Sequence, residues 1–168
     1  GEFGGDKNKS LTEQFEEMKD TVNKKHIPCK YIGYFQARTN TYADIETLKS
    51  KYEEVLSIPD VIGLNIATRC DAISDECLEY LTELNKRTLL TIELGLQTIH
   101  ESTAEFIRRG YPLETFTDAV QRLHDAGIEI IVHTILGLPG ETVSDMIETH
   151  RFLAAQPIQG IKLQLLHI

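Results

Sequence analysis

Strand-like and helix-like segments alternate along this chain, and the alternation restricts the fold more than any other feature. Five runs rich in β-branched, aromatic and other apolar residues are typical of strands; they lie at residues 29–36, 61–67, 89–95, 128–137 and 160–168. Apolar residues at helical spacing precede and separate these runs; the expected helices begin at Ser10, near Ile45, at Ser74, near residue 100, at Leu113 and at Thr142. This order predicts an α/β fold with a parallel sheet.

Local signals mark several of the helix ends. Ser10 with Glu13 predicts a capping box at the start of a helix over residues 10–25, and Thr142 with Asp145 predicts another helix start. Gly127 is expected at the end of the helix that begins at Leu113.

Length and charge narrow the class of protein. The 168 residues, 41% of them hydrophobic, suit one domain over residues 10–168 behind a flexible stub, residues 1–9. The net charge of −9 argues against a broad phosphate-binding surface. With no membrane-length apolar run and no signal segment, we expect a cytoplasmic protein without a membrane partner. Cys29, Cys70 and Cys77 lack metal-site spacing, so we expect reduced packing residues.

Each expected strand carries polar or small residues on one face. By the two-residue period of a strand, these are Tyr34, Gln36 and Arg38; Asn65, Ala67 and Arg69; Glu93, Gly95 and Gln97; Glu129, Ile131 and His133; Lys162, Gln164 and Leu166. Because unpaired buried polar groups are costly, the pattern favours a curved partial barrel with a polar ligand in its lumen. The alternative is an ordinary α/β sheet with these residues near strand ends or in a satisfied network. In both folds the ligand lies at the carboxyl ends of the strands.

Polar clusters follow four of the strands, and they define the candidate site. The clusters are "QARTNTY", "ATRCD", "GLQT" and "HTILGLPGE", whereas phosphate-loop, dinucleotide, hydrolase and zinc-protease motifs are absent. Glu93 has two open roles: structural partner of Arg69 or Arg109, or ligand-binding carboxylate. Gln97 can both donate and accept toward one ligand group. Arg108 is expected to be a solvated helix residue, and His133 is either a satisfied core histidine or a catalyst.

These motifs carry a family resemblance. "ELGLQT", then "FIRRG", then "HTILGLPGET", with "FQARTNTY" and "ATRCD" upstream, resemble the radical S-adenosylmethionine (SAM) superfamily. The chain is most similar to the uncharacterised Fe-S oxidoreductase group related to the Elongator protein 3 and coproporphyrinogen oxidase branches. The resemblance covers residues 30–168.

The resemblance implies a partial (β/α)6 TIM-like barrel with a [4Fe-4S] cluster on a C-x-x-x-C-x-x-C triplet after its first strand. The 168 residues contain no such triplet. Because "GEFGG" is similar to a segment that follows those cysteines, we expect this chain to begin just after the cluster loop. It would then hold barrel strands two to six and no metal ligand, and be inactive as it stands.

The resemblance also assigns roles to individual residues. Gln36, Thr39 and Asn40 lie where the family receives the methionine amino group of SAM, Gln97 and Arg109 match positions that bind its ribose and carboxylate, and His133 matches a ribose-binding position. Glu93 is expected to supply a polar function that relatives place one strand earlier. Leu166 and His167, at the end of the last strand, match the backbone that brackets adenine. Candidate substrate contacts are Asn65, Arg69, Asp71, Lys162 and Gln164.

The implied function is that of an Fe-S oxidoreductase. The intact protein would reductively cleave SAM to a 5′-deoxyadenosyl radical that abstracts hydrogen from an unknown substrate, with an external electron donor. One alternative is a non-enzymatic nucleotide or RNA binding module on a barrel fold, and another is a cluster-free barrel hydrolase. Without the first barrel strand, an exposed sheet edge on the next strand predicts self-association.

Overall fold

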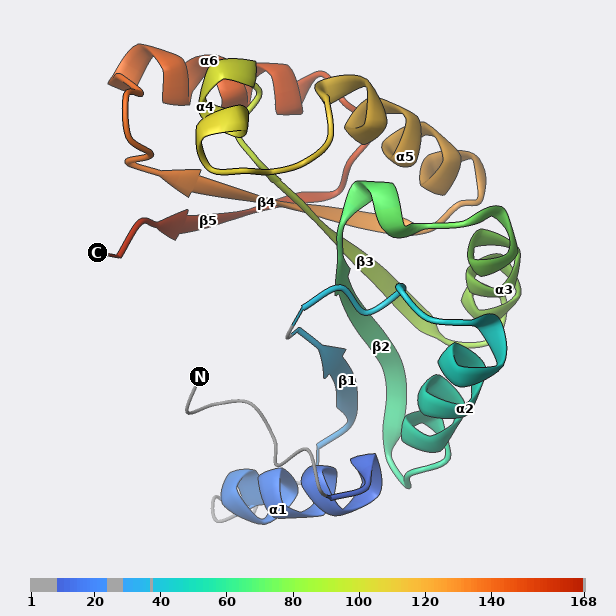
Figure 1. The fold of residues 1–168 in the computed structure, drawn as a ribbon. Helices are drawn as coiled ribbons and strands as arrows, with labels where there is room; N and C mark the ends of the chain where they lie inside the picture. Colours follow the sequence, from blue (N-terminus) through green and yellow to red (C-terminus); the bar gives the residue numbers. More distant parts are fainter. Residues whose placement is uncertain (1–8, 24–28, 37, 168) are drawn as a thin grey trace.

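Five parallel strands form one curled sheet in the order β1-β2-β3-β4-β5, with helices between consecutive strands (Figure 1). This computed structural model describes residues 9–23, 29–36 and 38–167. The sheet curls into an open half-barrel, which confirms the predicted α/β partial TIM-like fold. The proposed stub falls on residues 1–8 and Lys9; apart from Lys9 it lies outside the described residues and stays a prediction.

The strands and helices follow the predicted order. The strands are β1 (Tyr31–Phe35), β2 (Val61–Thr68), β3 (Leu89–Gln97), β4 (Glu129–Leu136) and β5 (Gly160–Leu165). The helices are α1 (Leu11–Asn23), α2 (Ile45–Leu56), η1 (Cys70–Ala72), α3 (Asp75–Asn85), α4 (Glu101–Phe106), α5 (Leu113–Asp125) and α6 (Val143–Ala154). β5 ends at Leu165, so the prediction that Leu166 and His167 end the last strand is wrong.

The predicted helix-end signals are confirmed. The Ser10 hydroxyl accepts from Glu13 N, and Ser10 N donates to the Glu13 carboxylate. Thr142 and Asp145 form the same reciprocal pair at the start of α6. Gly127 follows α5 with φ +68°, the left-handed conformation that glycine adopts at low cost.

The hydrophobic core lies between the convex face of the sheet and the helices outside it (Figure 1). Residues of β3 alternate, so that Ile92, Leu94 and Leu96 pack outward and are fully buried. Facing them are apolar residues of the helices, including Tyr52, Leu81, Leu84, Phe116 and Leu123. Each such side chain contributes about 1.5–3 kcal/mol when removed from water.

The inner face of the sheet holds the polar residues, as the two-residue period predicts. The strand register aligns Tyr34 with Asn65, Gly95 with His133, and His133 with Lys162. The sheet is curled (Figure 1), so the alternative of an ordinary α/β sheet is wrong, although Tyr34, Glu93 and Lys162 do form the satisfied network that this alternative included. Of the helices in the described part of the chain, none is long and apolar enough to cross a membrane.

Close backbone contact between β2 and β3 generates the first prediction. A Cβ at Gly63 would lie 2.6 Å from the Leu89 carbonyl oxygen, whereas one at Gly160 would meet nothing nearer than Ile131 Cγ1 at 3.4 Å. We expect Gly63→Ala to lower the free energy of unfolding by about 1–3 kcal/mol, because the two strands must separate. Urea unfolding measures this, with Gly160→Ala as the control; equal effects of the two variants would contradict the close contact.

Candidate active site

A buried carboxylate lies at the centre of the inner face. Glu93 is 4% exposed, and its Oε2 accepts from Tyr34 Oη at 2.6 Å. The same oxygen lies 2.5 Å from His133 Nε2 and 3.3 Å from Lys162 Nζ. Lys162 Nζ also donates to Tyr34 Oη at 2.7 Å. Glu93 pairs with neither Arg69 nor Arg109, so the predicted structural pairing with one of these arginines is wrong.

The charges of this group follow from its contacts. Burial acts to raise the pKa of the Glu93 carboxyl, but the hydrogen bonds from Tyr34 and His133 and the charge of Lys162 outweigh it, so the pKa lies below its ordinary value. Burial acts to lower the pKa of Lys162, yet its bonds to Tyr34 and Glu93 raise it. Burial and the bond to Glu93 raise the pKa of Tyr34. At neutral pH the carboxylate and the ammonium group are charged and the phenol is neutral.

A cavity of about 470 Å³ lies at the carboxyl ends of the strands. We call it the main cavity, because residues of the inner face line it. Its lining includes six of the predicted site residues, namely Thr39, Arg69, Glu93, Gln97, Arg109 and His133. Gln36 is exposed and does not line it. The structure thus brings most of the predicted SAM contacts to one concave site at the expected edge of the sheet.

Gln97 has the most unusual environment in this cavity. Its Oε1 is the one buried side-chain nitrogen or oxygen without a hydrogen-bond partner in the described part of the chain. Gly95 leaves room for the amide, because a Cβ there would lie 2.9 Å from Gln97 Nε2. Since an unpaired buried polar atom costs free energy, the Gln97 amide fits a cavity that receives a hydrogen-bonding ligand.

Backbone strain is concentrated around the same cavity. In the described part of the chain, four non-glycine residues have positive φ, and three of them line the cavity: Arg38 (71°), Gln97 (73°) and Arg108 (56°). Such conformations cost about 1–3 kcal/mol each and cluster at functional sites. Arg108 is exposed, as predicted, but it lies beyond the end of α4, so its predicted place in a helix is wrong. Sequence patterns do not reveal left-handed arginines.

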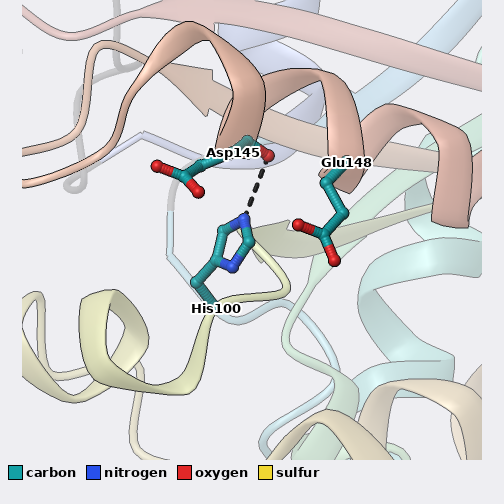
Figure 2. Close-up of side chains that lie close together, drawn as sticks. All are labelled: His100, Asp145 and Glu148. Atoms are coloured by element: carbon teal, nitrogen blue, oxygen red, sulfur yellow. Dashed lines mark hydrogen bonds between the residues drawn. The ribbon is translucent and has the colours of Figure 1, made fainter.

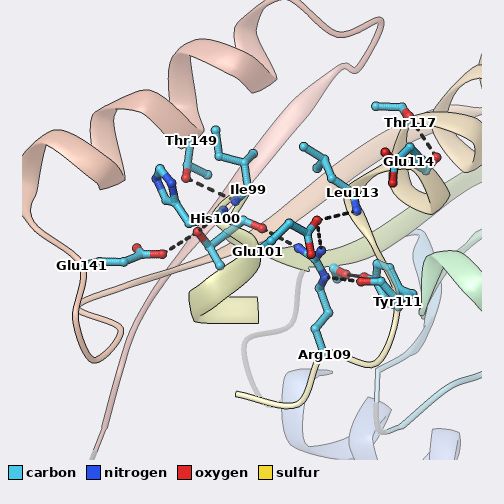
Figure 3. Close-up of polar contacts among 12 residues, drawn as sticks. Ile99, His100, Glu101, Arg109, Tyr111, Leu113, Glu114, Thr117, Glu141 and Thr149 are labelled. Atoms are coloured by element: carbon cyan, nitrogen blue, oxygen red, sulfur yellow. Dashed lines mark hydrogen bonds and ion pairs between the residues drawn. The ribbon is translucent and has the colours of Figure 1, made fainter. Parts of the chain in front are cut away.

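Arg109 is held in a buried network (Figure 3). Its Nε donates to Tyr111 O at 2.9 Å, its Nη1 to Thr98 O at 2.7 Å and its Nη2 to Glu101 Oε1 at 3.0 Å. Glu101 also accepts from Leu113 N at 2.7 Å, which ties α4 to α5. These bonds use three of the five guanidinium N–H donors, and Arg109 also lines the cavity.

Other predicted contacts are held by local bonds. Arg69 makes a two-pronged contact with Asp71, with Nε and Nη2 at 2.8 and 2.7 Å from the two carboxylate oxygens. Asn40 Nδ2 donates to the carbonyls of Phe35, Arg38 and Ala67, which fixes the loop after β1. Asn65 lies on the inner face beside Tyr34.

A second cavity of about 540 Å³ lies beside β5. Gln164, Leu166 and His167 line it, and it shares Ile135 with the first cavity. The residues predicted to contact adenine thus lie next to the main cavity but outside it.

The cysteines do not fit an iron-sulfur cluster. Cys70 and Cys77 are buried, and burial raises the pKa of each thiol to about 11. Cys29 is exposed, so its predicted packing role is wrong. Cluster ligands are closely spaced thiolates, and these three residues lie on separate segments. The described residues therefore provide no cluster site.

One further group of possible metal ligands lies away from the cavity. Figure 2 shows His100 beside Asp145 and Glu148 of α6, with ligand atoms within 4.8 Å of one another. His100 Nε2 contacts the Asp145 carbonyl at 3.0 Å, and the Asp145 carboxylate caps Thr142. These bonds explain the cluster as a contact between α6 and the loop after β3.

Comparisons with known proteins agree with this geometry. The family model described as Radical SAM superfamily matches residues 2–153. The uncharacterized protein YtqA of Bacillus subtilis is 45% identical over 168 residues, which are all of this chain and 52% of YtqA. This chain spans about half the length of the curated relatives it matches.

Two solved structures share the fold. The archaeal Elp3 of Methanocaldococcus infernus matches with a TM-score of 0.76 and 20% identity, over 91% of this chain and 41% of that one. The coproporphyrinogen III oxidase HemN of Escherichia coli, a radical SAM enzyme by its description, matches with a TM-score of 0.65 and 16% identity, over 82% of this chain and 32% of that one. At these identities the two matches show a shared fold.

The Glu93 contacts predict an acid-dependent stability. The pKa of Glu93 is lower in the folded chain than its unfolded value of about 4.3. The ionised Glu93 carboxylate therefore adds to the free energy of unfolding above that pH, and this stabilisation is lost as the pH falls through the folded pKa. We expect Glu93→Gln to lower the free energy of unfolding by about 1–3 kcal/mol at pH 7. The difference in free energy of unfolding between this variant and the unmodified chain should become smaller as the pH is lowered.

Urea unfolding between pH 7 and pH 3 checks this expectation. Glu105→Gln is the control, because Glu105 is exposed and lies outside the network. A gap between Glu93→Gln and the unmodified chain that stays constant across this range would contradict the assigned charges.

Proposed function

The chain belongs to the radical SAM superfamily, and from that premise we propose that its main cavity binds S-adenosylmethionine. The observation that carries the proposal is the unpaired, buried Oε1 of Gln97 at the carboxyl edge of the sheet. The ribose hydroxyls of SAM are donors that would satisfy this atom. The strained loops around the cavity support the same location.

Each part of SAM has a complementary group. Arg109 supplies a buried cation for the methionine carboxylate. Thr39 and the side-chain carbonyl of Asn40 supply acceptors for the ammonium group. Glu93 holds His133 at the ribose side. Gln36 belongs to the same proposed set at the loop margin, and Leu166 with His167 receives the adenine in the adjoining cavity.

We propose that the whole protein cleaves SAM reductively. One electron and SAM give methionine and a 5′-deoxyadenosyl radical, which takes a hydrogen atom from the substrate. A [4Fe-4S] cluster would supply the electron from an external donor, and the described residues provide none of its cysteine ligands. Asn65, Arg69, Asp71, Lys162 and Gln164 remain proposed substrate contacts. A cytoplasmic location is part of the proposal.

Binding of SAM to the 168-residue chain tests the site. Gln97→Met keeps the side-chain length but removes the amide, so we expect SAM affinity to fall about tenfold or more, the equivalent of one hydrogen bond to a buried polar group. Because Oε1 is unpaired without ligand, stability should change little. NMR titration with SAM measures the affinity, and Gln121→Met on α5 is the control. Equal affinity of Gln97→Met and the unmodified chain would refute the assignment.

We also propose that the chain self-associates through a sheet edge. The edge predicted from the sequence is β1, the first strand of the sheet, and its Ile32 is 47% exposed. Sedimentation should show species larger than the 19.0 kDa monomer, and Ile32→Lys should reduce them. A strictly monomeric chain at high concentration would contradict self-association.

A further inference from the structure

The main cavity is positively charged within an acidic protein. Its lining contains four arginines, Arg38, Arg69, Arg108 and Arg109, and one carboxylate, Glu93. The carboxylate is already neutralised by Lys162, whereas the whole chain carries a net charge of −9. The basic lining is therefore a local feature of this site and not a consequence of composition.

The four arginines fall into two classes. Arg69 is paired with Asp71, and Arg109 is paired with Glu101. Arg38 and Arg108 are exposed, and neither guanidinium has a hydrogen bond or ion pair with any other described residue. They come from two separate loops, after β1 and after α4. Two uncompensated cations thus line one concave site.

The backbone at both positions is held in an unusual conformation. Arg38 and Arg108 have φ of 71° and 56°, values that residues other than glycine rarely adopt. Asn40 Nδ2 donates to the Arg38 carbonyl, and Arg109 N donates to the Ala104 carbonyl, so neighbouring bonds fix each turn. Both arginines are therefore placed at the cavity by ordered loops.

We propose that Arg38 and Arg108 form a subsite for a phosphate group of the substrate, next to SAM. This inference rests on the proposed function, in which Arg109 receives the single carboxylate of SAM. Two further guanidinium groups need more acceptor oxygens than a carboxylate offers, and a phosphate or diphosphate provides them. The acidic charge of the chain as a whole favours a small phosphorylated molecule over nucleic acid.

Calorimetric titration of the 168-residue chain with inorganic pyrophosphate at low ionic strength tests the subsite. We expect binding that weakens about tenfold in Arg38→Gln and in Arg108→Gln, because each loses one charge-assisted contact. Arg151→Gln is the matched control: Arg151 is an exposed arginine on α6 outside the cavity lining, and its loss should leave binding unchanged. Circular dichroism confirms that each variant is folded.

Several outcomes would overturn the subsite. These are no pyrophosphate binding, equal binding by the two cavity variants and the unmodified chain, or equal losses in all three variants. Tighter binding of a single-stranded oligonucleotide than of pyrophosphate would contradict a small-molecule substrate. Gln97→Met should weaken SAM binding and leave pyrophosphate binding unchanged. Arg38→Gln should weaken pyrophosphate binding and leave SAM binding unchanged. Arginine-dependent pyrophosphate binding without SAM binding would therefore reject the proposed function and retain the anion site.

Discussion

The buried carboxylate of Glu93 is the interaction on which the inner face of this sheet depends. A half-barrel is open, so no backbone hydrogen bonds join its two edge strands. The Glu93 group provides a side-chain link instead, since Lys162 of β5 donates to Tyr34 of β1 and both contact Glu93 of β3. Because a buried carboxylate is costly without partners, the group is stable only when the sheet is curled enough to bring those strands together.

The same arrangement determines the character of the cavity above it. With Glu93 neutralised by its own partners, the remaining charged side chains in the lining of the main cavity are arginines. Arg109 is buried and fixed by backbone carbonyls, whereas Arg38 and Arg108 keep their donors for a ligand. The site therefore combines an unpaired amide, a fixed cation and two uncompensated cations, which suits a zwitterionic cofactor beside an anionic substrate.

The sequence predicted the elements and their faces because period and capping are local properties. Those rules placed Glu93, His133 and Lys162 on one face, and the motifs identified the family. They did not identify the partners of Glu93, since these depend on strand register and curl between residues as distant as Tyr34 and Lys162. Arg69 pairs with the nearby Asp71 instead. The left-handed turn at Arg108 was missed because arginine, and not the usual glycine, occupies this position after the short helix α4.

The central claim is that the main cavity is a SAM site, and a crystal structure of the chain grown with SAM tests it most directly. The account predicts SAM at the carboxyl edge of the sheet, with a ribose hydroxyl donating to Gln97 Oε1 and the carboxylate at Arg109. SAM bound elsewhere, or in the cavity with Gln97 Oε1 still unpaired, would contradict it.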